Sequence, residues 1–314
     1  MVNWSHIEEY GKKFHLSTEQ INSLKNCFEN INIDFLEQFI KLPLNQLPSK
    51  NELKKNFRDE QEMQRFLLLG ILISYPEFEK FYHDSGYPDK MFEDISYDLS
   101  IWQEKMQTDF GFPCLTLRIY EWSRAITLGN TLQFGRLQLN LCDYPFEHSI
   151  WRNGKSSPDV KFGLCKAPVP DLTKGDKIIN IHIPASGPLH ITDCIASLKE
   201  MYAFFKKYKP DYSYKAFCCF SWMLDPVFNK ILTQNSNIVK FQKLGMVFRE
   251  DSIDSTDETL WRLWDCKTAQ TGLDKNNPPE LKSSMQRAVA DYIFNGGRFA
   301  EGIMILFPEE VEKL

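Results

Sequence analysis

The sequence contains no apolar segment long enough to cross a membrane. Its longest apolar run is FLLLGILI at residues 66–73, far short of the ~20 residues that a membrane-spanning helix needs. The first residues, MVNWSHIEEYGKK, have no apolar stretch of the kind found in a secretory signal. We therefore expect a cytoplasmic protein with no membrane partner.

Paired cysteines are also missing. The eight cysteines are scattered singly apart from Cys218 and Cys219, and no CxxC motif occurs. A disulfide framework or a structural zinc site would need such pairs. The cysteines are therefore expected to be reduced residues of the core, and no metal is predicted.

An excess of positive charge is absent as well. The net charge is -5, with about -7 in residues 1–115 and +2 in the remainder. Proteins that bind nucleic acid usually carry a basic surface. The charge balance therefore argues against a nucleic-acid partner.

Helical periodicity dominates the first 128 residues. Ser17 and Gln20 fit a capping box at the start of a helix. Gly129 and Asn130 are suited to end the last helix of this region. We predict an all-helical N-terminal domain over 1–128, with further helices near 33–41, 60–74, 88–108 and 113–127, and helix starts near Pro76, Pro88 and Pro113.

The hydrophobic period changes to two after residue 130, which indicates strands. The run YKAFCCF at 214–220 is apolar on nearly both faces, so it is expected to be a central strand covered on both sides. The fold class is predicted as α/β (α+β), with a mixed-sheet domain over 129–314. Strands are expected at 133–141, 159–165, 177–183, 214–220, 245–249 and 299–307, and helices at 190–208, 226–232, 236–244, 256–264 and 279–294.

The segment 184–190 joins a strand to a helix. A loop of this kind can direct backbone N–H groups and a helix N-terminus at a phosphate. Ser186 and Gly187 allow close approach, whereas two prolines remove donors and Asp193 in the first helical turn competes with an anion. Two interpretations of this loop are therefore open: a phosphate-binding loop and a plain connection between strand and helix.

His182 ends a strand on its polar face, where a general base could act near neutral pH. The alternative is a histidine hydrogen-bonded in a packed interface. The sequence places Arg136, Gln138 and Asn140 on one expected strand and Asn180 beside His182 on another. This polar face either lines a cleft or faces solvent.

Ser221 follows the apolar strand, but the nucleophile-elbow motif GxSxG is absent. No histidine follows residue 190, which excludes the usual hydrolase order of Ser, Asp and His. Trp222 is interpreted as core or pocket wall, and Asp225 as a turn residue or helix cap. Arg298, after the turn at 295–297, is expected to be solvated.

Several of these motifs resemble those of a family. The segments 134–138, 182–184, 187–189, 221–226 and 236–238 are similar to landmarks of uncharacterised bacterial acyltransferase domain-containing proteins. The resemblance covers nearly the whole chain and implies a helical N-terminal domain followed by a GNAT-like domain. In GNAT folds, acyl-CoA lies between two central strands that part, here 177–183 and 214–220.

The resemblance implies an acyl-CoA-dependent N-acyltransferase. Acetyl-CoA or another acyl-CoA would be the donor and a small-molecule amine or a peptide the acceptor, with His182 taking the amine proton. The implied cofactor-binding residues are Ala185, Ser186, Gly187, Leu189 and His190, and the implied substrate cleft holds Arg136, Gln138, Asn180, Ser221 and Trp222. The loop departs from the usual [R/Q]-x-x-G-x-[G/A] pattern, which favours the alternative of a GNAT-like binding module without transferase activity.

Overall fold

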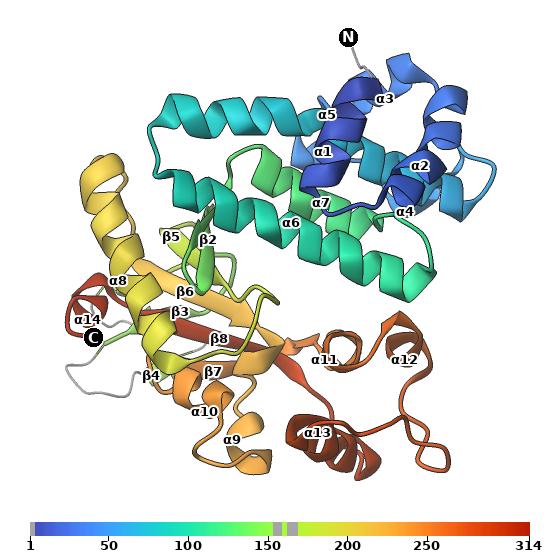
Figure 1. Ribbon diagram of the computed structural model, residues 1–314. Helices are drawn as coiled ribbons and strands as arrows, with labels where there is room; N and C mark the ends of the chain where they lie inside the picture. Colours follow the sequence, from blue (N-terminus) through green and yellow to red (C-terminus); the bar gives the residue numbers. More distant parts are fainter. Residues whose placement is uncertain (1–3, 153–158, 162–168) are drawn as a thin grey trace. The chain divides into compact units, whose positions relative to one another are not determined.

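The computed structural model describes residues 4–152, 159–161 and 169–314 (Figure 1). The chain divides into two compact units, Met1–Gln133 and Phe134–Leu314. Each unit is described by itself.

The N-terminal unit is helical, as predicted, and its described residues contain no strand before Thr131. The capping box at Ser17 is present, because the Gln20 backbone N–H donates to Ser17 Oγ at 3.2 Å and the Gln20 side chain accepts from the Ser17 N–H. The helices are α1 (Trp4–Lys13), α2 (Thr18–Asn30), α3 (Ile33–Phe39), α4 (Lys50–Lys54), α5 (Glu60–Ser85), α6 (Asp89–Phe110) and α7 (Leu117–Thr127), with a 3-10 turn η1 (Leu44–Gln46).

The helix expected at 60–74 is too short, and a helix start near Pro76 is wrong. α5 continues through Pro76 to Ser85. Burial accounts for the difference, because Phe66 and Phe78 on either side of the proline are fully buried. Packing of this apolar helix outweighs the loss of one backbone hydrogen bond at the proline.

The C-terminal unit contains a mixed sheet with the strand order β1-β2-β5-β6-β8-β7, whose edge strand β1 begins at Thr131, just before the boundary between the units. β5 and β6 are parallel, whereas β2 pairs with β5, and β8 with β6 and β7, in antiparallel fashion. The predicted mixed α/β fold is therefore confirmed. The strands of this sheet are β1 (Thr131–Phe134), β2 (Leu137–Asp143), β5 (Lys177–His182), β6 (Ala216–Ser221), β7 (Met246–Asp254) and β8 (Ala300–Leu306).

The strand predicted at 133–141 is wrong in one respect. It is a hairpin in which Gly135 and Arg136 form the turn between β1 and β2. Gly135 has φ +51°, a value that glycine adopts without strain. Arg136 therefore does not continue the polar face of β2, although Gln138 and Asn140 do.

The other predicted elements differ from the structure in length, whereas a strand at 149–151 and helices at 266–271 and 308–311 were not predicted. Only 159–161 of the strand expected at 159–165 are described, as β4 (Asp159–Lys161), which pairs with β3 (Ser149–Trp151); residues 162–165 lie outside the described residues. β7 runs five residues beyond the predicted end at 249 because Glu250 still pairs with Glu301 and Asp254 with Ala300. The helices are α8 (Ile191–Tyr208), α9 (Phe228–Ile231), α10 (Asn237–Gln242), α11 (Thr256–Leu263), α12 (Cys266–Thr271), α13 (Ser284–Phe294) and α14 (Pro308–Val311).

Apolar layers cover both faces of the sheet. α8 lies along one face in Figure 1, with Leu198 and Met201 fully buried. On the other face, Ile178 and Cys218 pack with Tyr144 and Ile303 in one cluster. β6 is therefore a central strand covered on both sides, as its apolar sequence predicted.

A buried ion pair joins the end of β6 to β7 and β8. The Asp225 carboxylate is fully buried, accepts from the Val227 and Ala300 backbone N–H groups at 2.9 and 2.8 Å, and pairs with Arg249 Nη1 at 2.8 Å. Gly302 of β8 allows the close approach, because a Cβ there would lie 2.0 Å from the Leu224 carbonyl carbon. The predicted turn role of Asp225 is confirmed, and its carboxylate also anchors this end of the sheet.

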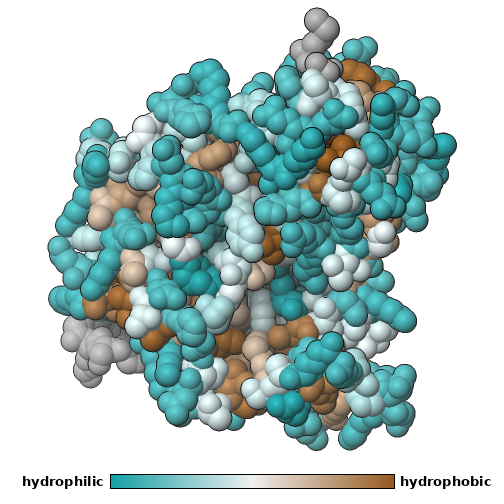
Figure 2. Space-filling model, viewed as in Figure 1, coloured by the Kyte–Doolittle hydropathy of each residue, from teal (hydrophilic) through white to brown (hydrophobic). Residues whose placement is uncertain are grey.

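Hydrophilic side chains occupy most of the surface that Figure 2 displays, with apolar residues interspersed. Among the described residues, no helix combines the length and the apolar character that crossing a membrane requires.

Candidate functional site

The parallel pairing of β5 with β6 ends at Ile181 and Cys219, one residue before β5 ends, and we call the region beyond this last pair the opening. Their parallel pairing runs from Ile178 with Ala216 to Ile181 with Cys219. Beyond that point β6 stays paired with β8 through Phe220 and Ser221, while β5 ends at His182 and leads into the loop before α8. An opening between the ends of parallel strands is a common ligand site in α/β proteins.

Four polar side chains share one face beside this opening. Gln138 lies opposite His182, and Asn140 lies opposite Asn180. Asn140 Oδ1 is 2.6 Å from His182 Nε2 and accepts from Asn180 Nδ2 at 3.1 Å. We call Gln138, Asn140, Asn180 and His182 the polar quartet.

The His182 imidazole is half-buried, and its burial lowers its pKa to about 4. The ring is therefore neutral at pH 7. The same Nε2 atom lies 2.6 Å from Asn140 Oδ1 and 3.2 Å from Asn180 Nδ2, so both asparagine amides contact this ring nitrogen. The imidazole is thus present in its proton-accepting form, although it is a weak base.

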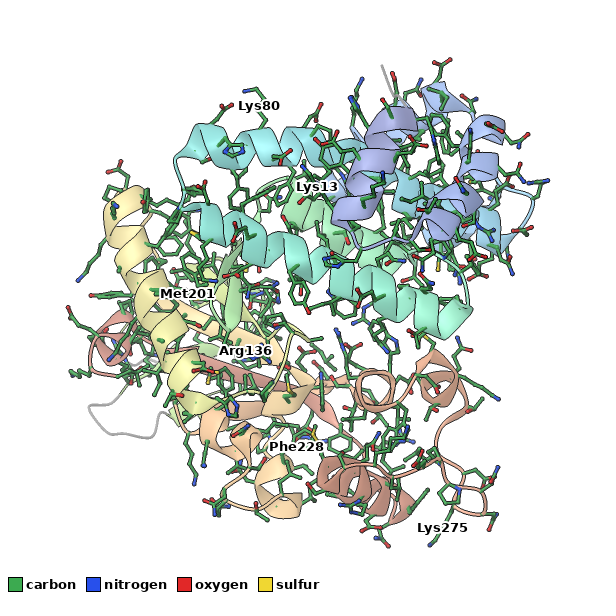
Figure 3. The ribbon with its side chains drawn as sticks, in the orientation of Figure 1. Lys13, Lys80, Arg136, Met201, Phe228 and Lys275 are labelled. Atoms are coloured by element: carbon green, nitrogen blue, oxygen red, sulfur yellow. The ribbon has the colours of Figure 1, made fainter. Side chains whose placement is uncertain are left out.

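Arg136 holds the loop that follows β5, and Figure 3 labels its side chain. Its guanidinium donates to three backbone carbonyls, those of Pro184 and Pro188 at 2.9 Å and that of Gly187 at 2.7 Å. Its own backbone N–H donates to Ser197 Oγ in α8 at 2.9 Å. The β1–β2 turn, the loop and α8 are therefore joined through one residue.

The three hydrogen bonds from the Arg136 guanidinium, which we call the Arg136 clamp, also orient the N–H groups of the loop. In a trans peptide, the carbonyl of one residue and the N–H of the next point in opposite directions. The N–H groups of Ala185 and Leu189 therefore point away from the Arg136 guanidinium. Ser186 and Gly187 are exposed between them, and Gly187 has φ +145°, a backbone conformation that residues with a Cβ rarely adopt.

α8 begins directly after this loop. Its N-cap residue, His190, is exposed and makes no side-chain capping hydrogen bond. An uncapped helix N-terminus carries partial positive charge and N–H groups suited to an anion. Asp193 in the first turn opposes that charge. The loop residues predicted to bind a cofactor thus meet at one helix end.

Ser221 and Trp222 have different surroundings. Ser221 Oγ accepts from the Met223 N–H at 3.2 Å, so the serine caps the short turn η2 (Trp222–Leu224). Trp222 packs with Phe228 in an apolar cluster of the following helices, and Figure 3 labels Phe228. The described side-chain contacts of Ser221 and Trp222 are therefore made with the residues that follow β6.

A second polar group on the quartet's face could not be predicted from the sequence. His148 is buried, with Nε2 2.7 Å from Tyr144 Oη and Nδ1 3.6 Å from a Glu250 carboxylate oxygen. Its burial lowers its pKa. Phe146 stacks on His148 and packs edge-on against Phe220, with a centroid distance of 5.1 Å. Tyr144, Phe146 and His148 lie in an irregular segment, where no periodicity indicates which side chains meet.

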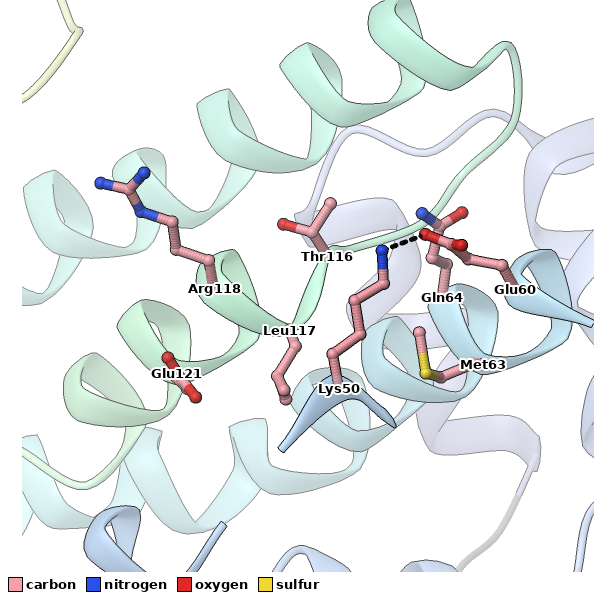
Figure 4. A pocket seen from close by; sticks show the side chains of 8 residues that line it. All are labelled: Lys50, Glu60, Met63, Gln64, Thr116, Leu117, Arg118 and Glu121. Atoms are coloured by element: carbon pink, nitrogen blue, oxygen red, sulfur yellow. Dashed lines mark ion pairs between the residues drawn. The ribbon is translucent and has the colours of Figure 1, made fainter. Parts of the chain in front are cut away.

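Two surface hollows lie away from these residues. One, of about 310 Å³ in the helical unit, is drawn in Figure 4, where Lys50 and Glu60 form an ion pair of 2.6 Å at its edge. The other, of about 270 Å³, lies beside the C-terminal end of α8. No predicted site residue lines either hollow. The described part of the chain groups no three His, Cys, Asp or Glu residues in a way that could hold a metal ion.

Residues 131–305 match the model of a family described as having a GNAT-like C-terminal domain. Three solved structures are similar to the chain at 16% identity over 96% of its length. They are an acyltransferase mutant in complex with octanoyl-CoA (TM-score 0.69, 88% of that chain), an acyltransferase with decanoyl-CoA (0.59, 99%) and an acyltransferase with decanoyl-CoA and teicoplanin (0.58, 99%). At this identity the likeness establishes the fold. No curated protein matches the chain in sequence.

The first prediction concerns the Arg136 clamp. Arg136→Lys keeps the charge but cannot reach three carbonyls at once. Losing hydrogen bonds from a charged donor should lower the free energy of unfolding by about 1.5–3 kcal/mol, measured by urea denaturation. Arg298→Lys is the matched control, because the Arg298 side chain is 81% exposed. Equal stability of the two variants would contradict the clamp.

The second prediction concerns pH. A histidine whose folded pKa of about 4 lies below its unfolded value stabilises the fold above pH ~6.5. That contribution is lost as the pH falls toward 4, because the unfolded chain binds the proton first. We expect His182→Gln to lose less stability than the wild type between pH 7 and 4 in thermal unfolding. If the stability of the two proteins changes with pH in the same way, the pKa of His182 is not lowered in the folded state.

Proposed function

Since the chain belongs to the family with a GNAT-like C-terminal domain, we propose that it is an acyl-CoA-dependent N-acyltransferase. The observation that carries the proposal is the Arg136-held loop, which joins the end of β5 to the uncapped N-terminus of α8. The unit that contains them, residues 129–314 in our proposed division, would carry the activity.

The loop would bind the pyrophosphate of CoA. The Ala185 and Leu189 N–H groups and the N-terminus of α8 offer donors, and the exposed Ser186 and Gly187 leave space for a phosphate. His190 stands at the helix entrance. Arg136 adds positive charge behind the loop, which offsets the donors that two prolines remove.

The acyl group would lie at the opening, beyond the last pair of β5 and β6. Backbone N–H groups on the open edge of β6 could stabilise the oxyanion that forms at the thioester carbonyl. The rings of Phe146 and Phe220 pack together on the quartet's face and offer apolar surface to an acyl chain. The octanoyl- and decanoyl-CoA of the structural neighbours favour a medium-chain donor over acetyl-CoA.

The acceptor would be a small-molecule or peptide amine, for which the neighbour in complex with teicoplanin offers a precedent. Its nitrogen would attack the thioester carbonyl directly. The C–N bond forms, the C–S bond breaks, and CoA leaves as the thiolate. His182 would take the proton from the nitrogen, directly or through water, once attack has made that nitrogen acidic.

A GNAT-like module that binds a ligand without transferring an acyl group is the second candidate. The pKa of about 4 favours it, because an imidazole of that basicity is a weak proton acceptor. Binding of octanoyl-CoA without release of CoA in the presence of primary amines would decide for this candidate.

The third prediction tests the CoA site. Ser186→Asp sets a carboxylate against the pyrophosphate at a few ångströms and should weaken octanoyl-CoA binding by tenfold or more, as measured by calorimetry. Ser284→Asp is the control, because this exposed serine begins α13, remote in sequence from the loop. An unchanged dissociation constant of octanoyl-CoA for Ser186→Asp would show that the loop is not part of the CoA site.

The fourth prediction tests His182. If it is the general base, His182→Ala should lower turnover of octanoyl-CoA with a primary amine by ~10²–10⁴-fold, followed by thiol release. The dissociation constant of octanoyl-CoA should stay the same. His6→Ala on the exposed surface of α1 controls for loss of a histidine. A His182→Ala protein that melts early but turns over normally would end the catalytic role.

A further inference from the structure

Gln138 is a buried amide without a partner. It is 1% exposed, and among the described residues neither its Nε2 nor its Oε1 has a hydrogen-bond partner. A buried polar group left unpaired destabilises a fold, and native proteins keep few of them. Such a group in the middle of a strand needs a physical reason.

Gln242 shows how the same fold satisfies a buried glutamine. Gln242 is 4% exposed, and its Nε2 donates to the Met223 and Asp225 carbonyls at 2.8 and 3.1 Å. Its Oε1 accepts from Asn229 Nδ2. The lack of partners at Gln138 is therefore a property of its position in the sheet, and Gln242 provides an internal reference.

A second unpaired atom lies on the same face. Asn180 Oδ1 is buried without a partner among the described residues, while Asn180 Nδ2 donates to Asn140 Oδ1. The two amides together leave two acceptor oxygens and one NH₂ group unused. The polar quartet contains no carboxylate, lysine or arginine, so it suits an uncharged group with hydrogen-bond donors and acceptors.

The strand order indicates which substrate this group belongs to. β5 separates β2 from β6, and neighbouring strands are about 4.8 Å apart. Gln138 on β2 is therefore on the far side of His182 from the opening between β5 and β6. If the acyl donor occupies that opening, the group that meets Gln138 belongs to the acceptor.

We infer that Gln138 and Asn180 form an acceptor subsite that binds a neutral carboxamide or hydroxyl group next to the amine that is acylated. This inference rests on the proposed function. Gln138 Nε2 donates to an oxygen of the acceptor, and the Gln138 and Asn180 side-chain oxygens accept from its N–H or O–H groups. Both are specificity-determining residues, and His182 remains the proposed base.

The fifth prediction begins with stability. Gln138→Met removes an unpaired amide at nearly constant volume, so it should raise Tm. The expected rise is roughly 2–4 °C, which corresponds to the free energy of about one hydrogen bond in a domain of this size. Gln242→Met removes satisfied hydrogen bonds and should lower Tm. A lowered Tm in both variants would overturn the subsite, because Gln138 would then have a structural partner.

Ligand binding gives an independent measurement. Glycinamide and propargylamine are primary amines of similar basicity, and only glycinamide carries a carboxamide. Saturation-transfer NMR on the full chain should show that the wild type prefers glycinamide by about tenfold, the effect of one hydrogen bond, and that Gln138→Met has lost this preference. Equal binding of the two amines by the wild type, or the same preference in the variant, would overturn the subsite.

Measuring octanoyl-CoA binding distinguishes a failure of this inference from a failure of the proposed function. Its failure to bind the wild-type chain would overturn the proposed function. Normal octanoyl-CoA binding without any preference for glycinamide would overturn the acceptor subsite alone. Unchanged octanoyl-CoA affinity in Gln138→Met, together with the lost glycinamide preference, would support both.

Discussion

The fork of hydrogen bonds from Arg136 is the interaction on which this site depends. The loop after β5 contains two prolines, which cannot donate backbone hydrogen bonds, so it has few ways to hold its own shape. Three guanidinium N–H groups supply the missing donors to the carbonyls of Pro184, Gly187 and Pro188. The backbone of the same residue is tied to Ser197 in α8. The end of β5 and the start of α8 are therefore held together by a residue that is distant from both in sequence.

Hydrophobic periodicity was enough to predict the fold class. Helical spacing before residue 128 and alternation after it predicted an all-helical region followed by a mixed sheet, and β6 was recognised as central from its apolar sequence. Two local signals misled the prediction. Gly135 was interpreted as a strand residue although it forms a turn, and Pro76 as a helix start although it lies within α5. In both cases contacts with distant residues decided the local conformation.

The chemistry of the site was less predictable than its location. Alternation placed Gln138, Asn140, Asn180 and His182 on one face, and the register confirms this. The partners of Arg136 could not be predicted, because its three carbonyls lie about fifty positions along the chain and no sequence period relates them. The pairs of Asp225 with Arg249 and of His148 with Glu250 depend in the same way on strand order. A single sequence gives the order of elements, but the contacts between distant segments require the fold.

The low basicity of His182 limits the amines that such a site could use. An imidazole with a pKa of about 4 cannot deprotonate a strongly basic ammonium before attack. The polar quartet includes no carboxylate that would stabilise an ammonium ion, and the unused oxygens of Gln138 and Asn180 accept hydrogen bonds from a neutral amine at no electrostatic disadvantage. If the chain acylates amines, the favoured acceptor is therefore one that is substantially neutral at the working pH. Amines next to an electron-withdrawing carboxamide or hydroxyl group meet that condition, since these substituents lower the basicity of the nitrogen. The same substituents carry hydrogen-bonding groups that could pair with the buried amides. One chemical feature of the acceptor would therefore lower the basicity of its nitrogen and also provide the hydrogen bonds that recognise it.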